Sequence, residues 1–326
     1  MFPAPIVHHP NQGGPQLDHD AQLTVLSWRA LREQTEEQLR SLSVDAPDSE
    51  ARWMIERVSG YDGVELVMGE AEPASDAARA HVDDMVVRRG RGEPLQYVLG
   101  EWQFLGLDLI VDRRVLVPRP ETEVVAQIAI DEAVRLGARR GAPESWTVVD
   151  DSFPIVDLGT GSGALALALV SALPEVFVWA TDASDDALAV ARANLAGTGV
   201  ASTRVRLASG SWFAALPSEL RGHVRVIVAN PPYIAQHEVP GLPRDVIEWE
   251  PYDALVSGPT GMEDIETIVA GAPEWLAAKG GALVVELAPH QAVAASERAR
   301  AAGFGDVSVR PDLTGRDRVL VARLRG

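Results

Sequence analysis

Apolar runs of strand length alternate with amphipathic helical patterns over the C-terminal half of the chain, and this alternation limits the possible folds more than any other feature. The strand candidates are residues 155–158, 176–181, 205–207, 224–228, 282–287 and 319–323. The helical patterns between them cover a stretch that ends at Leu173 and residues 184–195, 264–277 and 289–302. Such alternation is typical of a mostly parallel sheet with helices on both faces. It predicts a doubly wound α/β domain.

The part of the chain that precedes this domain has a different pattern. Leucines at helical spacing, a helix start at Pro47 and a helical stretch that ends at Gly90 predict a small helical domain. Residues 96–100 and 107–111 are then expected to pair as two strands around a turn. Pro120 and the acidic residues after it suit the start of a further helix. We therefore expect a disordered tail, a helical domain, a hairpin linker and an α/β domain, over residues 1–20, 21–90, 91–119 and 120–326.

Composition limits the class of protein and its partners. The chain has no cysteine, which fits a reducing compartment such as the cytoplasm, and its sequence has no apolar run that suits a membrane span or a signal peptide. Its net charge of −18 repels phosphate backbones and argues against a protein whose main role is to grip duplex DNA. His8, His9 and His19 in the tail lack the carboxylate or cysteine pattern of a metal site, so we expect no metal.

A glycine-rich segment joins the first strand of the α/β domain to its helix. It reads Asp157-Leu158-Gly159-Thr160-Gly161-Ser162-Gly163. Its glycines let the backbone turn sharply and approach a ligand closely at a helix N-terminus, although a simple glycine-rich turn is the alternative. The next strand ends at Asp182, whose carboxylate can accept both hydroxyls of a ribose. The two features predict a nucleoside-containing cofactor. Because Gly159, Gly161 and Ala164 also match the G-x-G-x-x-A dinucleotide fingerprint, they do not by themselves say which one.

A later strand candidate ends in Asn230-Pro231-Pro232-Tyr233. The Asn230 side-chain oxygen and the Pro231 carbonyl are two neighbouring acceptors, and the prolines contribute no backbone N–H and have a fixed φ. Such a corner can bind the two N–H bonds of a planar –NH2 group and leave its lone pair free to attack, which suits methylation of an amide or amino nitrogen. The alternative is an ordinary turn, because Asn-Pro is a common turn opener.

Two features then favour S-adenosylmethionine over a dinucleotide. Asp157 places an acid beside the glycines, where it suits a positively charged amino acid group better than a pyrophosphate. The Asn-Pro-Pro-Tyr corner has no role in hydride transfer. The residues therefore indicate a methyltransferase that uses S-adenosylmethionine.

Five segments, in this order, resemble the PrmC/HemK family of protein-(glutamine-N5) methyltransferases, which modify class I peptide chain release factors. They are Arg-Gly-Glu-Pro-Leu-Gln-Tyr-Val-Leu-Gly at 91–100, Val-Pro-Arg-Pro-Glu-Thr-Glu at 117–123, the Asn-Pro-Pro-Tyr corner, Glu250-Pro251 with Ala254-Leu255 and Gly258 to Gly261, and residues 312–319. The resemblance implies a Rossmann-like class I methyltransferase fold with a mostly parallel seven-stranded sheet, and a small helical N-terminal domain joined to it by a β-hairpin. It also implies a cytoplasmic enzyme that methylates the glutamine of a Gly-Gly-Gln loop in a release factor, without direct nucleic-acid binding.

The resemblance also implies roles for individual residues. Asn230 and Pro231 would be catalytic, and together with Pro232 and Tyr233 they would hold the substrate glutamine. The helical domain would help to dock the release factor. The residues that would contact S-adenosylmethionine are Asp157, Gly159, Thr160, Gly161, Ser162, Gly163, Asp182, Ser211, Trp212 and Asn230.

The chain departs from the family pattern at two places. Ser211 stands where the family usually has an acid that can hydrogen-bond the adenine amino group, and because a serine can still accept one hydrogen bond we expect weaker cofactor binding, not its loss. Glu286-Leu287-Ala288 stands where the family tends to have Glu-Ile-Gly, which leaves the fold and the chemistry intact. Trp212, taken alone, could equally be a buried core aromatic.

Two other functions are the alternatives. A nucleic-acid adenine-N6 methyltransferase could use the same corner, but it would need base flipping and normally an added recognition region. The stretch between Tyr233 and Lys279 is short and rich in proline and glycine, which does not suit such a region. A non-catalytic binding module that keeps the fold is supported only by Ser211.

Overall fold

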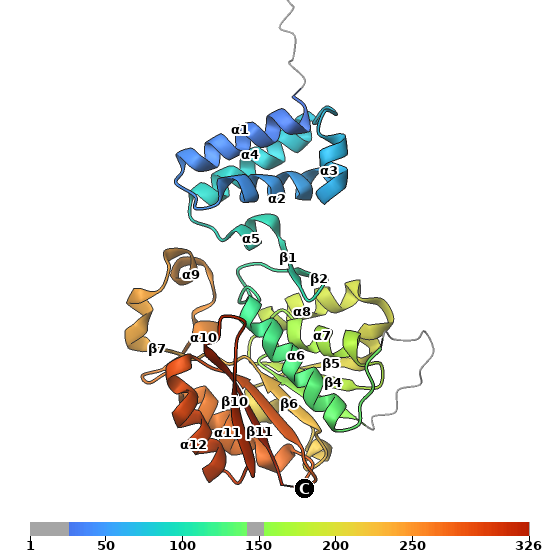
Figure 1. Ribbon diagram of the computed structural model, residues 1–326, viewed down its shortest axis with the longest axis vertical. Helices are drawn as coiled ribbons and strands as arrows, with labels where there is room; N and C mark the ends of the chain where they lie inside the picture. The colour runs from blue at the N-terminus through green and yellow to red at the C-terminus, as the bar shows by residue number, and fades with distance from the viewer. Residues whose placement is uncertain (1–25, 142–152, 326) are drawn as a thin grey trace, which may run out of the picture. The chain divides into compact units, whose positions relative to one another are not determined.

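The computed structural model describes residues 26–141 and 153–325 (Figure 1). The chain divides into two compact units, one that ends at Val86 and one that begins at Val87. The tail predicted over residues 1–20 lies outside the described residues. None of the helices within these ranges has both the length and the apolar composition that a membrane span requires.

The N-terminal unit is built from helices. These are α1 (Trp28–Ser41), α2 (Pro47–Ser59), α3 (Gly63–Gly69) and most of α4 (Asp76–Gly90). Ser27 caps α1 by accepting a hydrogen bond from the backbone N–H of Ala30 at 3.2 Å, and Gly60, at φ 73°, ends α2. The core contains buried apolar side chains that include Leu31, Leu39, Met54, Ile55, Val82 and Met85. The helical pattern predicted for this part of the chain is confirmed from Trp28 onward.

The segment after α4 differs from its prediction. The sequence predicts a strand over residues 96–100, but the structure has a short helix there, α5 (Leu95–Leu99). The guanidinium of Arg88 donates to the carbonyl oxygens of Tyr97 at 2.8 Å and Val98 at 3.1 Å, so it satisfies acceptors that the end of a helix leaves free. Gly100, at φ 76°, then ends the helix. A short apolar run cannot distinguish a buried helical turn from a strand, which is why the prediction was wrong.

A β-hairpin is present, and its second strand is the one predicted over residues 107–111, but its first strand begins only at Glu101, after the helix. Strand β1 (Glu101–Phe104) pairs antiparallel with β2 (Leu107–Ile110). Asn194, on α8 (Asp185–Gly197), accepts a hydrogen bond from the N–H of Ile110 at 2.7 Å and donates to its carbonyl at 3.0 Å. The same amide donates to the carbonyl of Ser162 at 2.8 Å. Asn194 thereby ties the hairpin to the glycine-rich segment.

The C-terminal unit is built around a seven-stranded sheet with the order β10-β11-β9-β6-β3-β4-β5. The five strands from β9 to β5 are parallel to one another, and β10 and β11 are antiparallel. The strands are β3 (Pro154–Leu158), β4 (Phe177–Asp182), β5 (Val205–Ser209), β6 (Val226–Ala229), β9 (Ala282–Glu286), β10 (Asp306–Pro311) and β11 (Asp317–Arg323). A small parallel pair, β7 (Ile234–Ala235) and β8 (Val256–Gly258), is separate from this sheet. The mostly parallel seven-stranded sheet is confirmed.

Helices cover both faces of this sheet (Figure 1). One face is covered by α6 (Pro120–Arg135), α7 (Ala164–Ala172) and α8, and the other by α11 (Glu263–Trp275) and α12 (Ala292–Ala301). Along β3, Ile155 points into the first layer and Val156 into the second. Because both faces of the strands are buried, the strands appear in the sequence as continuous apolar runs. The predicted Rossmann-like class I methyltransferase fold is confirmed.

Strand β3 lies at the point in the sheet where successive strands are added first on one side and then on the other, and this places the predicted motifs together. The chain passes from β3 to β4 and β5 on one side and then to β6 and β9 on the other. Such a reversal opens a crevice at the carboxyl ends of the strands, where open α/β sheets bind ligands. The glycine-rich segment follows β3, Asp182 ends β4 and the Asn-Pro-Pro-Tyr corner follows β6. All three motifs therefore lie at one edge of the sheet.

Candidate active site

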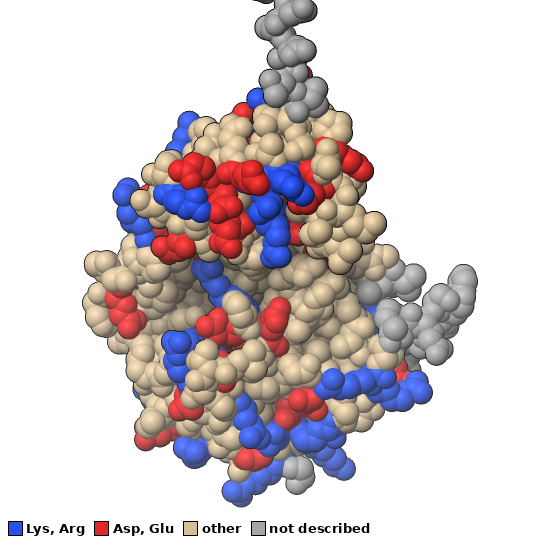
Figure 2. Space-filling view, turned by 45° about the horizontal axis from the view of Figure 1, so that its top comes forward, with Lys and Arg blue, Asp and Glu red and all other residues tan. Residues whose placement is uncertain are grey.

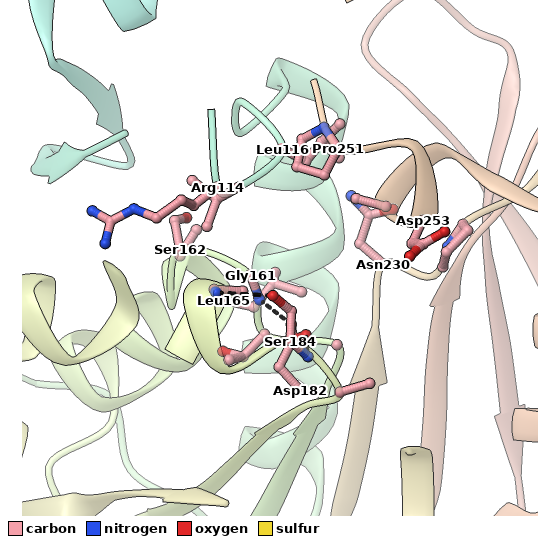
Figure 3. Close-up of a pocket in the computed structure, with 18 of the residues that line it drawn as sticks. Arg114, Leu116, Gly161, Ser162, Leu165, Asp182, Ser184, Asn230, Pro251 and Asp253 are labelled. Carbon is pink, nitrogen blue, oxygen red and sulfur yellow. Dashed lines mark hydrogen bonds between the residues drawn. The ribbon is translucent and has the colours of Figure 1, made fainter. Parts of the chain in front are cut away.

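A cavity of about 620 Å³ opens at this edge of the sheet, within the C-terminal unit (Figure 3). The predicted site residues that line it are Gly159, Thr160, Gly161, Ser162, Asp182, Ser211, Trp212, Asn230 and Pro232. Four other predicted residues are not among its lining residues: Asp157, Gly163, Pro231 and Tyr233. The remaining walls include residues from the loop after β2, Thr122 near the start of α6, and residues 251–254.

The glycine-rich segment forms a tight turn that exposes its backbone. Gly159, Gly161 and Gly163 have φ values of 72°, 55° and 86°, in the left-handed region that glycine adopts most easily. The N–H groups of Gly159 and Thr160 both donate to the carbonyl of Thr181 at 2.8 Å, which fastens the turn to the end of β4. A Cβ on Gly161 would meet nothing within 4 Å. A ligand can therefore approach the backbone at Gly161 closely.

Asp157 lies behind this turn and not in the cavity wall. Its carboxylate is fully buried, and Oδ2 accepts hydrogen bonds from the hydroxyl of Thr160 at 2.6 Å and from the N–H of Ala166 at 3.2 Å. Burial raises the pKa of Asp157 to about 7. Asp157 thus holds the shape of the turn, and its direct contact with a cofactor stays a prediction.

Asp182 lies at the end of β4 and lines the cavity (Figure 3). Its Oδ2 accepts a hydrogen bond from the N–H of Gly161, and its Oδ1 from the N–H of Ser184, each at 2.9 Å. Burial raises the pKa of Asp182, and the backbone hydrogen bonds act against that shift. Each carboxylate oxygen has a further lone pair. The backbone therefore fixes the Asp182 carboxylate and leaves it able to accept ligand hydroxyls.

Trp212 and Ser211 form the wall beyond β5. The backbone of Trp212 has φ 46°, a conformation that a bulky residue adopts only where its surroundings impose it. A Cβ on Gly159 would lie 3.3 Å from the Cζ3 atom of Trp212, so the indole packs against the glycine turn. The indole also packs against the hydrophobic core. Trp212 therefore serves as both core aromatic and cavity wall, and the exposed Ser211 lines the cavity beside it.

Asn230 lies just after β6 and well apart from Asp182 in the view of Figure 3. Its Nδ2 donates to the hydroxyl of Thr122 at 3.1 Å, and that hydroxyl donates to Oε2 of Glu286 at 2.8 Å. One hydrogen of the Asn230 NH2 group is used in this bond, which holds the amide with Oδ1 turned away from Thr122, where it can accept a hydrogen bond from a ligand. The hydroxyl of Tyr233 is 3.4 Å from Oε1 of Glu286, to which it donates. No role was predicted for Thr122 or Glu286, although Thr122 stands in one of the five segments that carry the family resemblance.

A partly buried ion pair fastens the wall formed by residues 251–254. Arg119, which precedes α6, pairs with Glu250, which follows α9 (Arg244–Trp249). Burial raises the pKa of Glu250, and the neighbouring guanidinium of Arg119 lowers it. The next residues form α10 (Tyr252–Leu255), of which Tyr252 and Asp253 line the cavity. This pair could not be predicted from the sequence, because no spacing rule connects residues that lie 131 positions apart.

The fold is shared with a solved methyltransferase. The catalytic domain of human METTL16, solved in complex with the MAT2A 3′UTR hairpin 1, matches with a TM-score of 0.52 at 14% sequence identity. The match covers 88% of this chain and 91% of that chain. At this identity the likeness supports the fold and nothing more specific.

Sequence comparisons identify the family. The PrmC N-terminal domain matches residues 30–100, and the methyltransferase small domain matches residues 147–258. The release factor glutamine methyltransferase of Burkholderia pseudomallei is 38% identical, over 89% of this chain and 96% of its own length. That of Deinococcus radiodurans is 36% identical, over 92% of this chain and 100% of its own length. The chain therefore belongs to the release factor glutamine methyltransferase family.

Proposed function

We propose that this chain transfers a methyl group from S-adenosylmethionine to the side-chain amide nitrogen, N5, of a glutamine in a protein. The protein substrate is a class I peptide chain release factor, and the glutamine is that of its Gly-Gly-Gln loop. The names of the relatives support this substrate. The observation that carries the chemistry is the orientation of Asn230, whose nitrogen is engaged by Thr122 while its oxygen is left to bind an amide N–H.

The residues that line the cavity fit the proposed cofactor. The Asp182 carboxylate suits ribose hydroxyls, the bare backbone at Gly161 allows close approach, and the Trp212 ring offers an apolar face to a base. Ser211 offers one hydroxyl at the position where the family usually has an acid, so we expect the adenine to be held less tightly. When bound, S-adenosylmethionine supplies an electrophilic methyl group on a positively charged sulfur.

The chain's own contribution to the reaction is to hold the acceptor nitrogen. An amide nitrogen is a poor nucleophile because its lone pair is delocalised into the carbonyl. Oδ1 of Asn230 and the carbonyl oxygen of Pro231 accept hydrogen bonds from the two N–H groups of the substrate amide. These hydrogen bonds favour a pyramidal nitrogen and direct its lone pair toward the methyl group. Tyr233 packs against the glutamine side chain. Positioning of this kind can lower a barrier by up to about 7–11 kcal/mol, so no strong base is required and the proton can leave after methyl transfer.

A protein partner suits the charge of this chain better than a nucleic acid. On the face in Figure 2, acidic and basic side chains are interspersed, and the net charge is −18. A phosphate backbone favours a continuous basic surface. Methylation of adenine in a nucleic acid is therefore the less favoured function, and the helical N-terminal unit is the part that we expect to help dock the release factor.

A comparison of methyl acceptors tests this proposal. The enzyme is incubated with S-adenosylmethionine that carries a labelled methyl group, together with a release factor, the same factor with alanine in place of the Gly-Gly-Gln glutamine, or single-stranded and duplex nucleic acid. We expect label in the unaltered release factor alone. Label in nucleic acid but not in the release factor would replace the proposal with the adenine-N6 alternative.

Gly261→Ala is expected to impair turnover by disturbing the Asn-Pro-Pro-Tyr corner. Gly261 has φ 79°, and a Cβ there would lie 2.6 Å from the carbonyl oxygen of Tyr233 and 3.0 Å from the N–H nitrogen of Ala235. Because backbone atoms must move, we expect kcat/KM for the release factor to fall by about 100-fold, as small misplacements at a reacting centre can cause. Steady-state kinetics measures this change.

Gly222→Ala is the matched control for that variant. Gly222 has a similar φ of 72°, but a Cβ there would meet nothing within 4 Å. An alanine in the left-handed region should lower the free energy of unfolding by about 1–2 kcal/mol in both variants, whereas only Gly261→Ala should lose turnover. Equal kinetics in the two variants would show that the contact with the Tyr233 carbonyl does not matter.

A further inference from the structure

A chain of hydrogen bonds runs from Asn230 into the protein interior and connects three elements. Asn230 follows β6, Thr122 stands in the first turn of α6, and Glu286 ends β9. Thr122 is 4% exposed and Glu286 1%, so neither depends on solvent for its hydrogen bonds. The two links measure 3.1 Å from Nδ2 of Asn230 to Oγ1 of Thr122, and 2.8 Å from that oxygen to Oε2 of Glu286.

The chain has a direction, and the direction decides how Asn230 is oriented. A threonine hydroxyl has one hydrogen, and here it is donated to Glu286. Thr122 can then only accept from Asn230, so the NH2 group of Asn230 must face inward and its Oδ1 must face the cavity. If the amide were reversed, two oxygens would meet with no hydrogen between them, and a buried polar contact of that kind is costly.

We propose that Thr122 and Glu286 are positioning residues, which keep the oxygen of Asn230 turned toward the nitrogen that is methylated. This inference rests on the proposed function of the cavity. Neither residue needs to touch the substrate glutamine. Glu286 accepts the hydrogen of the Thr122 hydroxyl, and the Thr122 oxygen therefore accepts from the Asn230 NH2 group. This sets the orientation of the Asn230 amide, and Asn230 is the residue that contacts the substrate.

The charge of Glu286 determines whether the chain keeps this direction. Ionised Glu286 can only accept, whereas protonated Glu286 can donate to Thr122 and free the Thr122 hydrogen to bind the oxygen of Asn230. The amide would then turn its NH2 group toward the substrate nitrogen, which also carries hydrogens. The groups that act on Glu286 are Thr122 and Glu121 on α6, Arg318 on β11 and Tyr233 after β6.

The pKa of Glu286 places this change near neutrality. Burial raises it to about 7, Glu121 adds to the rise, and Thr122, Arg318 and Tyr233 oppose it. The ionised form, which predominates above that pKa, is the form that orients Asn230 productively. We therefore expect kcat to be high above pH 7 and to fall as the pH drops through about 7.

Variants of Thr122 separate this role from a purely structural one. Thr122→Val keeps the shape and removes the hydroxyl, and we expect it to lower kcat by about 100-fold with less than a threefold change in the Kd for S-adenosylmethionine. Thr122→Ser keeps the hydroxyl and should stay within threefold of the wild-type kcat. Thr267→Val, which removes an exposed hydroxyl on α11 that donates to the Glu263 carbonyl, is the matched control and should change neither quantity. A Thr122→Val enzyme with wild-type kcat, or a Thr122→Ser enzyme as impaired as Thr122→Val, would overturn the inference.

Glu286→Gln tests the pH dependence and keeps the inference separable from the proposed function. We expect this variant to lose the fall in kcat near pH 7. In parallel, NMR of the Asn230 side-chain NH2 signals should titrate with an apparent pKa of about 7 in the wild-type protein and not in Glu286→Gln, with no substrate present. If the side-chain NH2 signals of Asn230 did not change with pH in the wild-type protein, the inference would be overturned. A wild-type chain that shows the titration but does not methylate a release factor would contradict the proposed function alone.

Discussion

Asn230→Ala is expected to lower kcat for release factor methylation by about 1,000-fold, the upper range for removal of one preorganised polar group at a reacting centre. The variant loses Oδ1, which we propose accepts a hydrogen bond from an N–H of the substrate amide. It also removes the NH2 group that donates to the Thr122 hydroxyl. The residue makes this contact only while the acceptor nitrogen is being positioned, so kcat should fall more than KM rises. Single-turnover kinetics with saturating S-adenosylmethionine measures the effect on the chemical step.

Gln127 on α6 offers a control, because its amide is exposed, donates to Oδ1 of Asp131 at 3.4 Å and does not line the cavity. Gln127→Ala should leave kcat unchanged. Calorimetry should show that Asn230→Ala still binds S-adenosylmethionine within about tenfold of the wild-type Kd, because Asp182 and the glycine-rich segment remain. Near-wild-type turnover by Asn230→Ala would contradict the proposed clamp on the amide nitrogen.

Asp182→Ala is expected to raise the Kd for S-adenosylmethionine by at least about 100-fold, since each of two hydroxyl hydrogen bonds to a carboxylate contributes roughly 1.5–3 kcal/mol and about 1.4 kcal/mol is a factor of ten. The substitution also removes the acceptor that the N–H of Gly161 uses at 2.9 Å, so the glycine turn loses part of its support. Calorimetric titration of the purified protein with S-adenosylmethionine measures the change directly.

Asp185→Ala controls for the loss of one acidic side chain nearby. Asp185 begins α8, is exposed and does not line the cavity. We expect its Kd to stay within about twofold of the wild-type value, a difference below 0.5 kcal/mol. If Asp182→Ala and Asp185→Ala had the same Kd, the cofactor would bind elsewhere, or would bind in the cavity without placing its ribose at the end of β4.

Most of the fold could be predicted because the strands are buried on both faces. The central strands appear as apolar runs in the sequence, and turns and helix starts separate them. Strand β10 was missed because it lies at the edge of the sheet and carries a mixed sequence, Asp-Val-Ser-Val-Arg-Pro. The strand predicted over residues 96–100 proved to be a short helix, because a short apolar run does not distinguish a strand from a buried helical turn. Arg88, in the preceding helix, donates to its last carbonyls, a contact that the apolar pattern does not reveal.

The site could be predicted only where its residues adjoin strands. The glycine-rich segment, Asp182 and Asn230 each follow a strand of the parallel sheet, so the topology alone brings them together. Thr122, Glu286 and Arg119 were missed because their partners are far away along the chain, 108 residues for Asn230 and Thr122 and 164 for Thr122 and Glu286. No local pattern specifies such a contact. Asp157 shows a related limit, since the sequence places it beside the glycines but cannot say that its side chain is buried behind them.

Tandem mass spectrometry of a release factor after incubation with this enzyme and S-adenosylmethionine tests the proposed activity most directly. We predict one added methyl group, located on the side-chain nitrogen of the glutamine in the Gly-Gly-Gln loop, and its absence when Asn230→Ala replaces the wild-type enzyme. An unmodified glutamine in a reaction where calorimetry confirms that the wild-type enzyme binds S-adenosylmethionine would contradict the proposal.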